Sequence, residues 1–256
     1  MSMNWATSKS TVSTLDTTLA IVHSLEEKET ASIDELAEEL DLAPSTVHRH
    51  LLTLRKQGYI VKNQEYQLGM RFLTLGGHVQ NNHHGYDLAK QKVDQLAAET
   101  EERVQFIVEE HGRRYYLYTQ TGENAVQTDA NLGKQGHLHS SASGKAILAA
   151  LPDDRVHEII DEYGLSASTP NTITDQESLF DELEDIRESG VAFNEEESTV
   201  GLRAVGTAVC GNDGLPVGAL SISGPARRFK GEKFRQELPD LILASANELE
   251  LKIQFE

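Results

Sequence analysis

The first 40 residues carry apolar side chains at helical spacing. In "TVSTLDTTLAIVHSLEEK", residues 11–28, steps of three and four residues place one apolar stripe on a helix face: Leu15, Leu19, Val22 and Leu25. A shorter helix is predicted next, because Ser32 followed by Glu35 is the pattern of a capping box. Its apolar face would consist of Ile33, Leu36, Ala37 and Leu40.

A third helix and a small hairpin complete this pattern. In "STVHRHLLTLRKQG", Val47, Leu51 and Leu54 are predicted to be buried, and Gly58 to end the helix. The following "YIVKNQEYQLG" is typical of two short strands around a turn. Helix, short helix, turn, helix and hairpin is the element order of a winged helix-turn-helix, which we place at residues 1–75.

The rest of the chain predicts a linker and an α+β domain. Residues 76–102 keep a broken helical pattern and are predicted to be a linker helix region. From residue 103 alternating runs predict strands in "RVQFIVEEHG", "RRYYLYTQTG", "NAVQTDANLG", "VAFNEEE", "LRAVGTAVCG" and "PVGALSISGP". Helical segments lie between and after them, the last at about residues 231–255. Residues 103–256 are therefore predicted to form an antiparallel sheet with flanking helices.

Composition narrows the class of protein. The 256 residues are 38% apolar, and no stretch approaches the length of a membrane span. The start, "MSMNWATSKS", has no apolar signal-peptide core, and the single Cys210 excludes an internal disulfide framework. We expect a cytoplasmic protein without a membrane partner. The adjacent His83 and His84 would point about 100° apart on a helix and could not easily share a metal ion. Neither a metal site nor a cofactor is expected.

Charge is distributed unevenly along the chain. The net charge is −18, and residues 76–256 carry −15 of it, with sixteen Lys or Arg against thirty-one Asp or Glu. Residues 44–75 hold five basic residues against Glu65 alone, a net of +4. A local positive patch is what a polyanion partner requires. The overall acidity favours adaptation to a salt-rich cytoplasm, and an ordinary acidic protein is the alternative.

The polar face of the third helix is a candidate DNA-binding surface. It has hydrogen-bond donors and fixed cations but no carboxylate. Its N-terminal end could reach base edges, while Arg55, Lys56 and the hairpin's Lys62 could hold phosphates. The complete predicted set is Ser45, Thr46, His48, Arg49, Thr53, Arg55, Lys56 and Lys62.

The stretch "HLHSSASGKAILAALP", residues 137–152, is crowded with reactive side chains but matches no catalytic motif. A phosphate loop would need glycine at His139 and a hydroxyl at Ala146. A nucleophile elbow would need glycines two residues either side of Ser143, and an S-x-x-K motif would need serine at Ala142. The simplest interpretation is the start of an apolar helix capped by serine.

Three functions are compatible with these features. The first is a ligand-responsive transcription factor. The second is an enzyme that uses Ser143, His139 and Lys145, although no base and orienting partner can be named for it. The third is a protein-interaction module whose winged helix no longer binds DNA.

Three separated motifs decide between them by resemblance. The chain has "LAPSTVHRHLLTLRKQGYI" followed by "YQLGMRFLTLG", then "LHSSASGKAILA", then "GVAFNEEESTVGLRAVGTAV" and "GALSISGP". In this order they resemble the IclR family of transcriptional regulators, over nearly the whole chain. The resemblance implies a winged-helix domain joined by a helix to a GAF-like effector domain, with homodimers or dimers of dimers bound to a double-stranded DNA operator.

The resemblance also implies an effector pocket. Carried over, its positions are Ala142, Ser143, Asn194, Leu202, Ala204, Ser221 and Ser223. Some members have an acidic residue at the position of Asn194 and a cysteine at that of Ala204, which bears on the identity of the ligand.

A small organic acid or sugar-derived acid is the expected effector. A helix that starts beside "SSASGK" would present free N–H groups and the positive end of its dipole to a carboxylate. Ser143, Ser221 and Ser223 would add hydroxyl groups. His139 and Arg203 could lend positive charge or could equally be structural.

Salt should stabilise the folded chain. The −15 carried by residues 76–256 repels itself in dilute buffer, and added ions screen that repulsion. We expect the melting temperature to rise clearly between low and molar KCl, as measured by circular dichroism. A flat melting temperature over that range would exclude salt adaptation.

Overall fold

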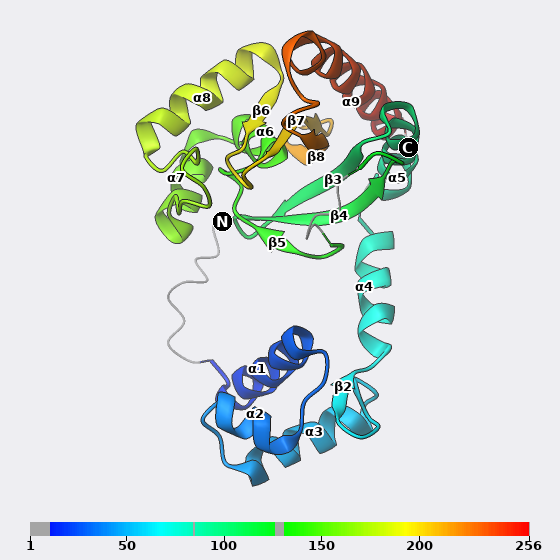
Figure 1. Cartoon of the computed structure of the whole chain (residues 1–256), viewed down its shortest axis with the longest axis vertical. Helices are drawn as coiled ribbons and strands as arrows, with labels where there is room; N and C mark the ends of the chain where they lie inside the picture. The colour runs from blue at the N-terminus through cyan, green and yellow to red at the C-terminus, as the bar shows by residue number, and fades with distance from the viewer. Residues whose placement is uncertain (1–10, 84, 126–130, 256) are drawn as a thin grey trace. The chain divides into compact units, whose positions relative to one another are not determined.

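The computed structural model describes residues 11–83, 85–125 and 131–255, which form two compact units (Figure 1). The first unit ends at Val79 and the second begins at Gln80. The elements of the first unit are α1 Ser13–Lys28, α2 Ile33–Glu39, α3 Pro44–Lys56, β1 Ile60–Lys62 and β2 Tyr66–Leu68. They follow the predicted order of a winged helix-turn-helix.

The core of the first unit confirms the predicted face of α3. Val47, Leu51 and Leu54 are all buried, and the predicted Ser32–Glu35 capping box is present at the start of α2. In α1 the helix was predicted correctly but the apolar stripe does not coincide with its buried face. Leu15 and Leu19 remain 59% and 55% exposed, and α1 instead buries Ile21 with Leu25. Periodicity identifies a helix, but it does not say which of its turns reach the core.

Residues 71–100 form two helices that differ in burial. The first, α4 Arg71–Asn81, spans the boundary between the units and has no buried residue. The second, α5 Tyr86–Thr100, buries Ala89, Val93 and Leu96 in the core of the second unit. This second half of the predicted linker region is therefore a layer of the second unit.

The second unit is built on a six-stranded antiparallel sheet with the strand order β5-β4-β3-β8-β7-β6. Its strands are β3 Arg103–Glu110, β4 Arg113–Thr121, β5 Gln135–Gly136, β6 Ala192–Glu195, β7 Leu202–Cys210 and β8 Pro216–Pro225. The strand predicted in residues 124–133 falls partly outside the described residues, and β5 lies just after it. The other helices are α6 Ala142–Ala150, α7 Asp153–Tyr163, α8 Gln176–Ser189, a π-helical turn Lys233–Glu237 and α9 Leu238–Gln254.

The two faces of this sheet are covered by different helices. In Figure 1, α5 and α9 lie together on one side, against an apolar face that includes Phe106, Leu220 and Ile222. On the other side α6 packs on the sheet, with α7 and α8 beyond it. Among the described residues, no helix combines the length and apolar character that a membrane span requires.

Candidate functional site

The sheet face beneath α6 is apolar in one half and polar in the other. Ile107 pairs with Ala219, and the next position along the same face pairs Gln105 with Ser221. One step further, Ser223 pairs with Ala204, which in turn pairs with Asn194. Because side chains two residues apart share a face, these polar groups of β3, β8 and β6 form a patch on one face of the sheet, with the small Ala204 of β7 between Ser223 and Asn194. Helix α6 covers the apolar half, and its first turn borders the polar half.

Two glycines set how closely the start of α6 approaches its neighbours. A Cβ on Gly144 would lie 2.1 Å from the Leu138 carbonyl oxygen. A Cβ on Gly206 of β7 would lie 2.7 Å from the Ser143 backbone nitrogen. The Ser141 hydroxyl caps the helix by accepting a hydrogen bond from the Gly144 N–H at 3.2 Å. The predicted serine cap is therefore present, and glycine is needed because backbone packs directly against backbone.

A cavity of about 40 Å³ lies between the polar patch and the start of α6. All seven residues predicted for the effector pocket line it: Ala142, Ser143, Asn194, Leu202, Ala204, Ser221 and Ser223. Five more lining residues were not predicted: Gln105, Arg114, Tyr116, Ser141 and Ser198. The structure thus gathers the predicted set from four separate elements, and its role in binding stays a prediction.

Several polar side chains of the cavity are buried without a protein partner. Gln105, Ser143, Ser221 and Ser223 are only 2–6% exposed. Within the described residues, none of these four side chains makes a hydrogen bond to protein. Buried polar groups are normally satisfied, so unpartnered groups around one cavity indicate a place for water or a polar ligand.

Arg114 gives this cavity a positive charge. Its Nε donates to the His137 carbonyl oxygen at 2.9 Å, and its Nη1 donates to the Tyr116 hydroxyl. The other terminal nitrogen, Nη2, makes no hydrogen bond within the described part of the chain. No carboxylate is found among the described residues that line the cavity. The cavity therefore combines one cation with six hydroxyl groups and suits an anion.

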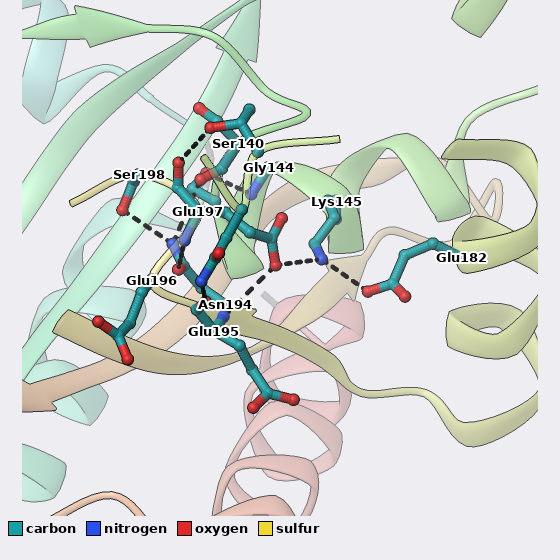
Figure 2. A network of polar contacts seen from close by, with 12 residues as sticks. Ser140, Gly144, Lys145, Glu182, Asn194, Glu195, Glu196, Glu197 and Ser198 are labelled. Atoms are coloured by element: carbon teal, nitrogen blue, oxygen red, sulfur yellow. Dashed lines mark hydrogen bonds and ion pairs between the residues drawn. The ribbon is translucent and has the colours of Figure 1, made fainter. Parts of the chain in front are cut away.

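A buried ion network adjoins the cavity at Asn194 (Figure 2). Lys145, 1% exposed, donates to Glu182 at 2.6 Å and to Glu197 at 2.9 Å. Burial raises the pKa of the Glu197 carboxyl group, and the Lys145 ammonium opposes that rise. Lys145 is thus fixed in an ion pair and is not a free nucleophile.

The other residues of the hypothetical enzyme site are also held apart. His139 lies 3.1 Å from the Ser166 carbonyl oxygen, and burial lowers its pKa, so the ring is largely neutral at pH 7. Ser143 is hydrogen-bonded to neither His139 nor Lys145 within the described residues. A serine nucleophile requires such a bond to its base. The described residues also contain no group of three His, Cys, Asp or Glu that could hold a metal ion.

Arg203, the other possible source of positive charge, is used structurally. It donates to the Phe229 carbonyl oxygen at 3.1 Å and pairs with Glu195 at 3.4 Å. Of the open alternatives for His139 and Arg203, the structural one matches these contacts. Arg114 supplies the charge instead, and its position on β4 explains why the motifs did not reveal it.

The predicted DNA-binding residues lie on the outer face of α3 and on β1. All of them are exposed except Thr46, which is partly buried. The set consists of Ser45, Thr46, His48, Arg49, Thr53, Arg55, Lys56 and Lys62. Within the described residues, none of the four Lys and Arg side chains forms an ion pair. Lys62 lies over the Tyr66 ring at 4.8 Å, and the Thr53 hydroxyl donates to the Arg49 carbonyl oxygen. Unpaired cations on an exposed helix are available to phosphates and base edges, although binding itself stays a prediction.

Two family models match the chain. One, described as "IclR helix-turn-helix domain", matches residues 14–64. The other, described as "Bacterial transcriptional regulator IclR C-terminal", matches residues 77–251. Together they cover both units, in the order that the motifs predicted.

Individual relatives agree with these models. The probable HTH-type transcriptional regulator ArcR of Halobacterium salinarum is 33% identical over 241 residues, which cover 91% of both chains. The HTH-type transcriptional regulator KdgR of Escherichia coli is 28% identical over 88% of this chain and 87% of its own. The crystal structure of Thermotoga maritima IclR is similar with a TM-score of 0.80 at 30% identity, covering 94% of this chain and 98% of that one.

A further solved structure shares the fold and contains a ligand. It is an IclR homolog from Microbacterium hydrocarbonoxydans, complexed with 4-hydroxybenzoate. Its TM-score is 0.78 at 21% identity, and the match covers 93% of this chain and 100% of that one.

Gly144→Ala should destabilise the second unit. The added methyl group would overlap the Leu138 carbonyl, and backbone cannot move aside cheaply. We expect a loss of about 1–3 kcal/mol or more in the free energy of unfolding, measured by urea denaturation. Gly76→Ala in α4 is the control, because a Cβ there meets no atom within 4 Å. It should be neutral or stabilising by roughly 0.5–1 kcal/mol, and equal losses in both variants would contradict the close contact.

Proposed function

The chain belongs to the IclR family of transcriptional regulators, and from this membership we propose that a small organic acid controls its binding to DNA. Regulators of this family bind DNA through the helix-turn-helix domain and a small molecule through the C-terminal domain, and they are not enzymes. The class of effector, the residues that bind it and the contacts to DNA are our proposals for this chain.

One observation carries the proposed class of effector. Buried polar side chains without partners surround a cavity whose only charged lining residue, among those described, is Arg114. A carboxylate would pair with the free Nη2 of Arg114 in a charge-assisted hydrogen bond. The unpartnered Gln105, Ser221 and Ser223 would then bind hydroxyl or keto oxygens of the same molecule. The ligand of the Microbacterium homolog, 4-hydroxybenzoate, is also a carboxylate and supports this class.

The size of the cavity favours a short acid. A volume of about 40 Å³ holds about three water molecules, since each water needs roughly 10–15 Å³ by this measure. A three-carbon hydroxy acid such as glycerate displaces a similar number. Longer sugar acids would require the surrounding side chains to move.

On the DNA side, we propose that Arg49 reads a base and that Arg55, Lys56 and Lys62 hold phosphates. One winged helix offers few contacts, so we expect a homodimer, or a dimer of dimers, on a pseudo-palindromic operator. The unpaired cations of α3, in a chain with a net charge of −18, support a DNA-binding winged helix over a protein-interaction module.

Substitution of two arginines should separate base reading from phosphate binding. Arg49→Ala should weaken binding to the DNA upstream of its own gene by about 1–3 kcal/mol and relax sequence preference. Arg55→Ala should weaken binding to all sequences alike and reduce the salt slope by about one. Fluorescence anisotropy against specific and scrambled duplexes measures both effects. Unchanged specific affinity in folded Arg49→Ala would remove Arg49 from the interface, and a footprint without repeats would contradict the dimer.

A matched three-carbon series tests the class of effector. Glycerate, glycerol and 3-amino-1,2-propanediol share one skeleton and differ in charge. Glycerate alone should raise the melting temperature, because a ligand that binds only the folded state stabilises it. Pyruvate and gluconate would extend the series in oxidation state and length.

The same series tests the cavity itself. Ser143→Leu fills the cavity and should abolish the glycerate response while leaving DNA binding intact. Ser143→Ala, which removes only a hydroxyl group, should weaken glycerate binding by about twofold to tenfold. A response in Ser143→Leu equal to that of the wild type would place the effector site elsewhere.

A further inference from the structure

Asn194 belongs both to the cavity and to the buried ion network, and its hydrogen bonds fix which end of the amide is which (Figure 2). The Glu197 backbone N–H donates to Asn194 Oδ1 at 3.0 Å. Asn194 Nδ2 donates to the Ser140 carbonyl oxygen at 3.2 Å. A backbone N–H can only donate and a carbonyl can only accept, so the amide has one possible orientation.

Ser198 takes the second N–H of this amide. Asn194 Nδ2 donates to Ser198 Oγ at 2.8 Å, and both residues line the cavity. The acceptor of Ser198 is a side-chain hydroxyl in the loop after β6, whereas the acceptor of Ser140 is a backbone carbonyl oxygen just before α6. Of the two acceptors on Asn194, the Ser198 hydroxyl is therefore the one that a ligand oxygen can replace.

The position of Glu197 depends on its partners on two sides. Its carboxylate accepts a hydrogen bond from Lys145, which also binds Glu182 of α8. Its carbonyl oxygen accepts from the Thr172 hydroxyl at 2.6 Å. Lys145 thus links α6, α8 and the loop that presents the Glu197 N–H to Asn194.

We propose that Asn194 donates a hydrogen bond to an effector oxygen at the place now occupied by the Ser198 hydroxyl, and that the Lys145–Glu197 pair is the positioning element that keeps the amide in this orientation. This inference rests on the proposed effector cavity and makes its selectivity specific. An acceptor such as a carboxylate or keto oxygen matches the Asn194 N–H, whereas an ammonium group would place one donor against another at this N–H. The cavity would then select against amines at two points, Arg114 and Asn194.

Glu182 provides a matched control, because it binds the same lysine but is not part of the loop next to Asn194. Removing either carboxylate takes away one negative charge near the cavity. If only charge mattered, Glu182→Ala and Glu197→Ala would both tighten the binding of an acid. If Glu197 positions the amide, Glu197→Ala alone should weaken it, and Glu197→Gln, which keeps the acceptor for Lys145, should restore most of the affinity.

Isothermal titration of the full-length chain with glycerate and with 3-amino-1,2-propanediol tests the selectivity. Relative to the wild type, we expect glycerate to bind about threefold to tenfold more weakly to Glu197→Ala and no more weakly to Glu182→Ala.

Ser198→Ala, which removes the internal competitor, should bind glycerate more tightly. Asn194→Asp, which cannot donate when ionised, should lose glycerate and shift preference toward the amine. Weaker glycerate binding in Ser198→Ala, or equal effects of the two glutamate variants, would overturn the proposal while leaving the effector cavity in place.

Hydrogen exchange of residues 194–201 tests the positioning element without any ligand. The exchange of the residue 197 backbone N–H should be faster in Glu197→Ala than in the wild type, Glu182→Ala or Glu197→Gln. If the wild type binds the amine and not the acid, both the proposed class of effector and the donor role of Asn194 are wrong. If it binds neither compound, the exchange rates still decide: equal protection in all four proteins would show that the pair does not hold this loop.

Discussion

The second unit depends on a contact that leaves no room for a side chain. The start of α6 lies against the Leu138 carbonyl at Gly144 and against β7 at Gly206. Backbone is the least adjustable part of a packed interior, so these contacts fix both the height and the direction of α6 above the sheet. The first turn of the helix then stops short of the polar patch, and the cavity is the space that remains. Most of its lining residues consequently lie on helices and strands, whereas Ser141 and Ser198 lie in the loops before α6 and after β6.

The sequence was most informative where one element determines the pattern. The helical period and the capping box identified the winged helix-turn-helix, and the face of α3 with Val47, Leu51 and Leu54 was correct. Leu15 and Leu19 show the limit of this reasoning, because only tertiary packing decides which turns of a helix are buried. For the cavity, the seven predicted residues came from resemblance to a family, in motifs that the fold brings together.

Gln105 and Arg114 were missed for a physical reason. They lie on β3 and β4, outside every motif, and reach the cavity only through the pairing of β4 with β3 and of β3 with β8. Strand register is a long-range property that a local pattern does not contain. The alternation of each strand indicates two faces but not the neighbour on either side. The positive charge of the cavity therefore became visible only in the assembled sheet.

The unpartnered side chains of the cavity also set the stability of the fold against its response to an effector. A buried polar group with neither a protein partner nor water costs about 1–3 kcal/mol; water in the cavity of about 40 Å³ offsets part of that cost in the free protein, and an apolar side chain of similar shape would remove the remainder. Substitutions such as Ser221→Val would therefore stabilise the fold and at the same time remove the response to the effector. Selection for thermal stability alone would favour such variants. Their target genes would then no longer change expression when the effector is present. The polar lining of this cavity is maintained only as long as the response to the effector matters to the organism.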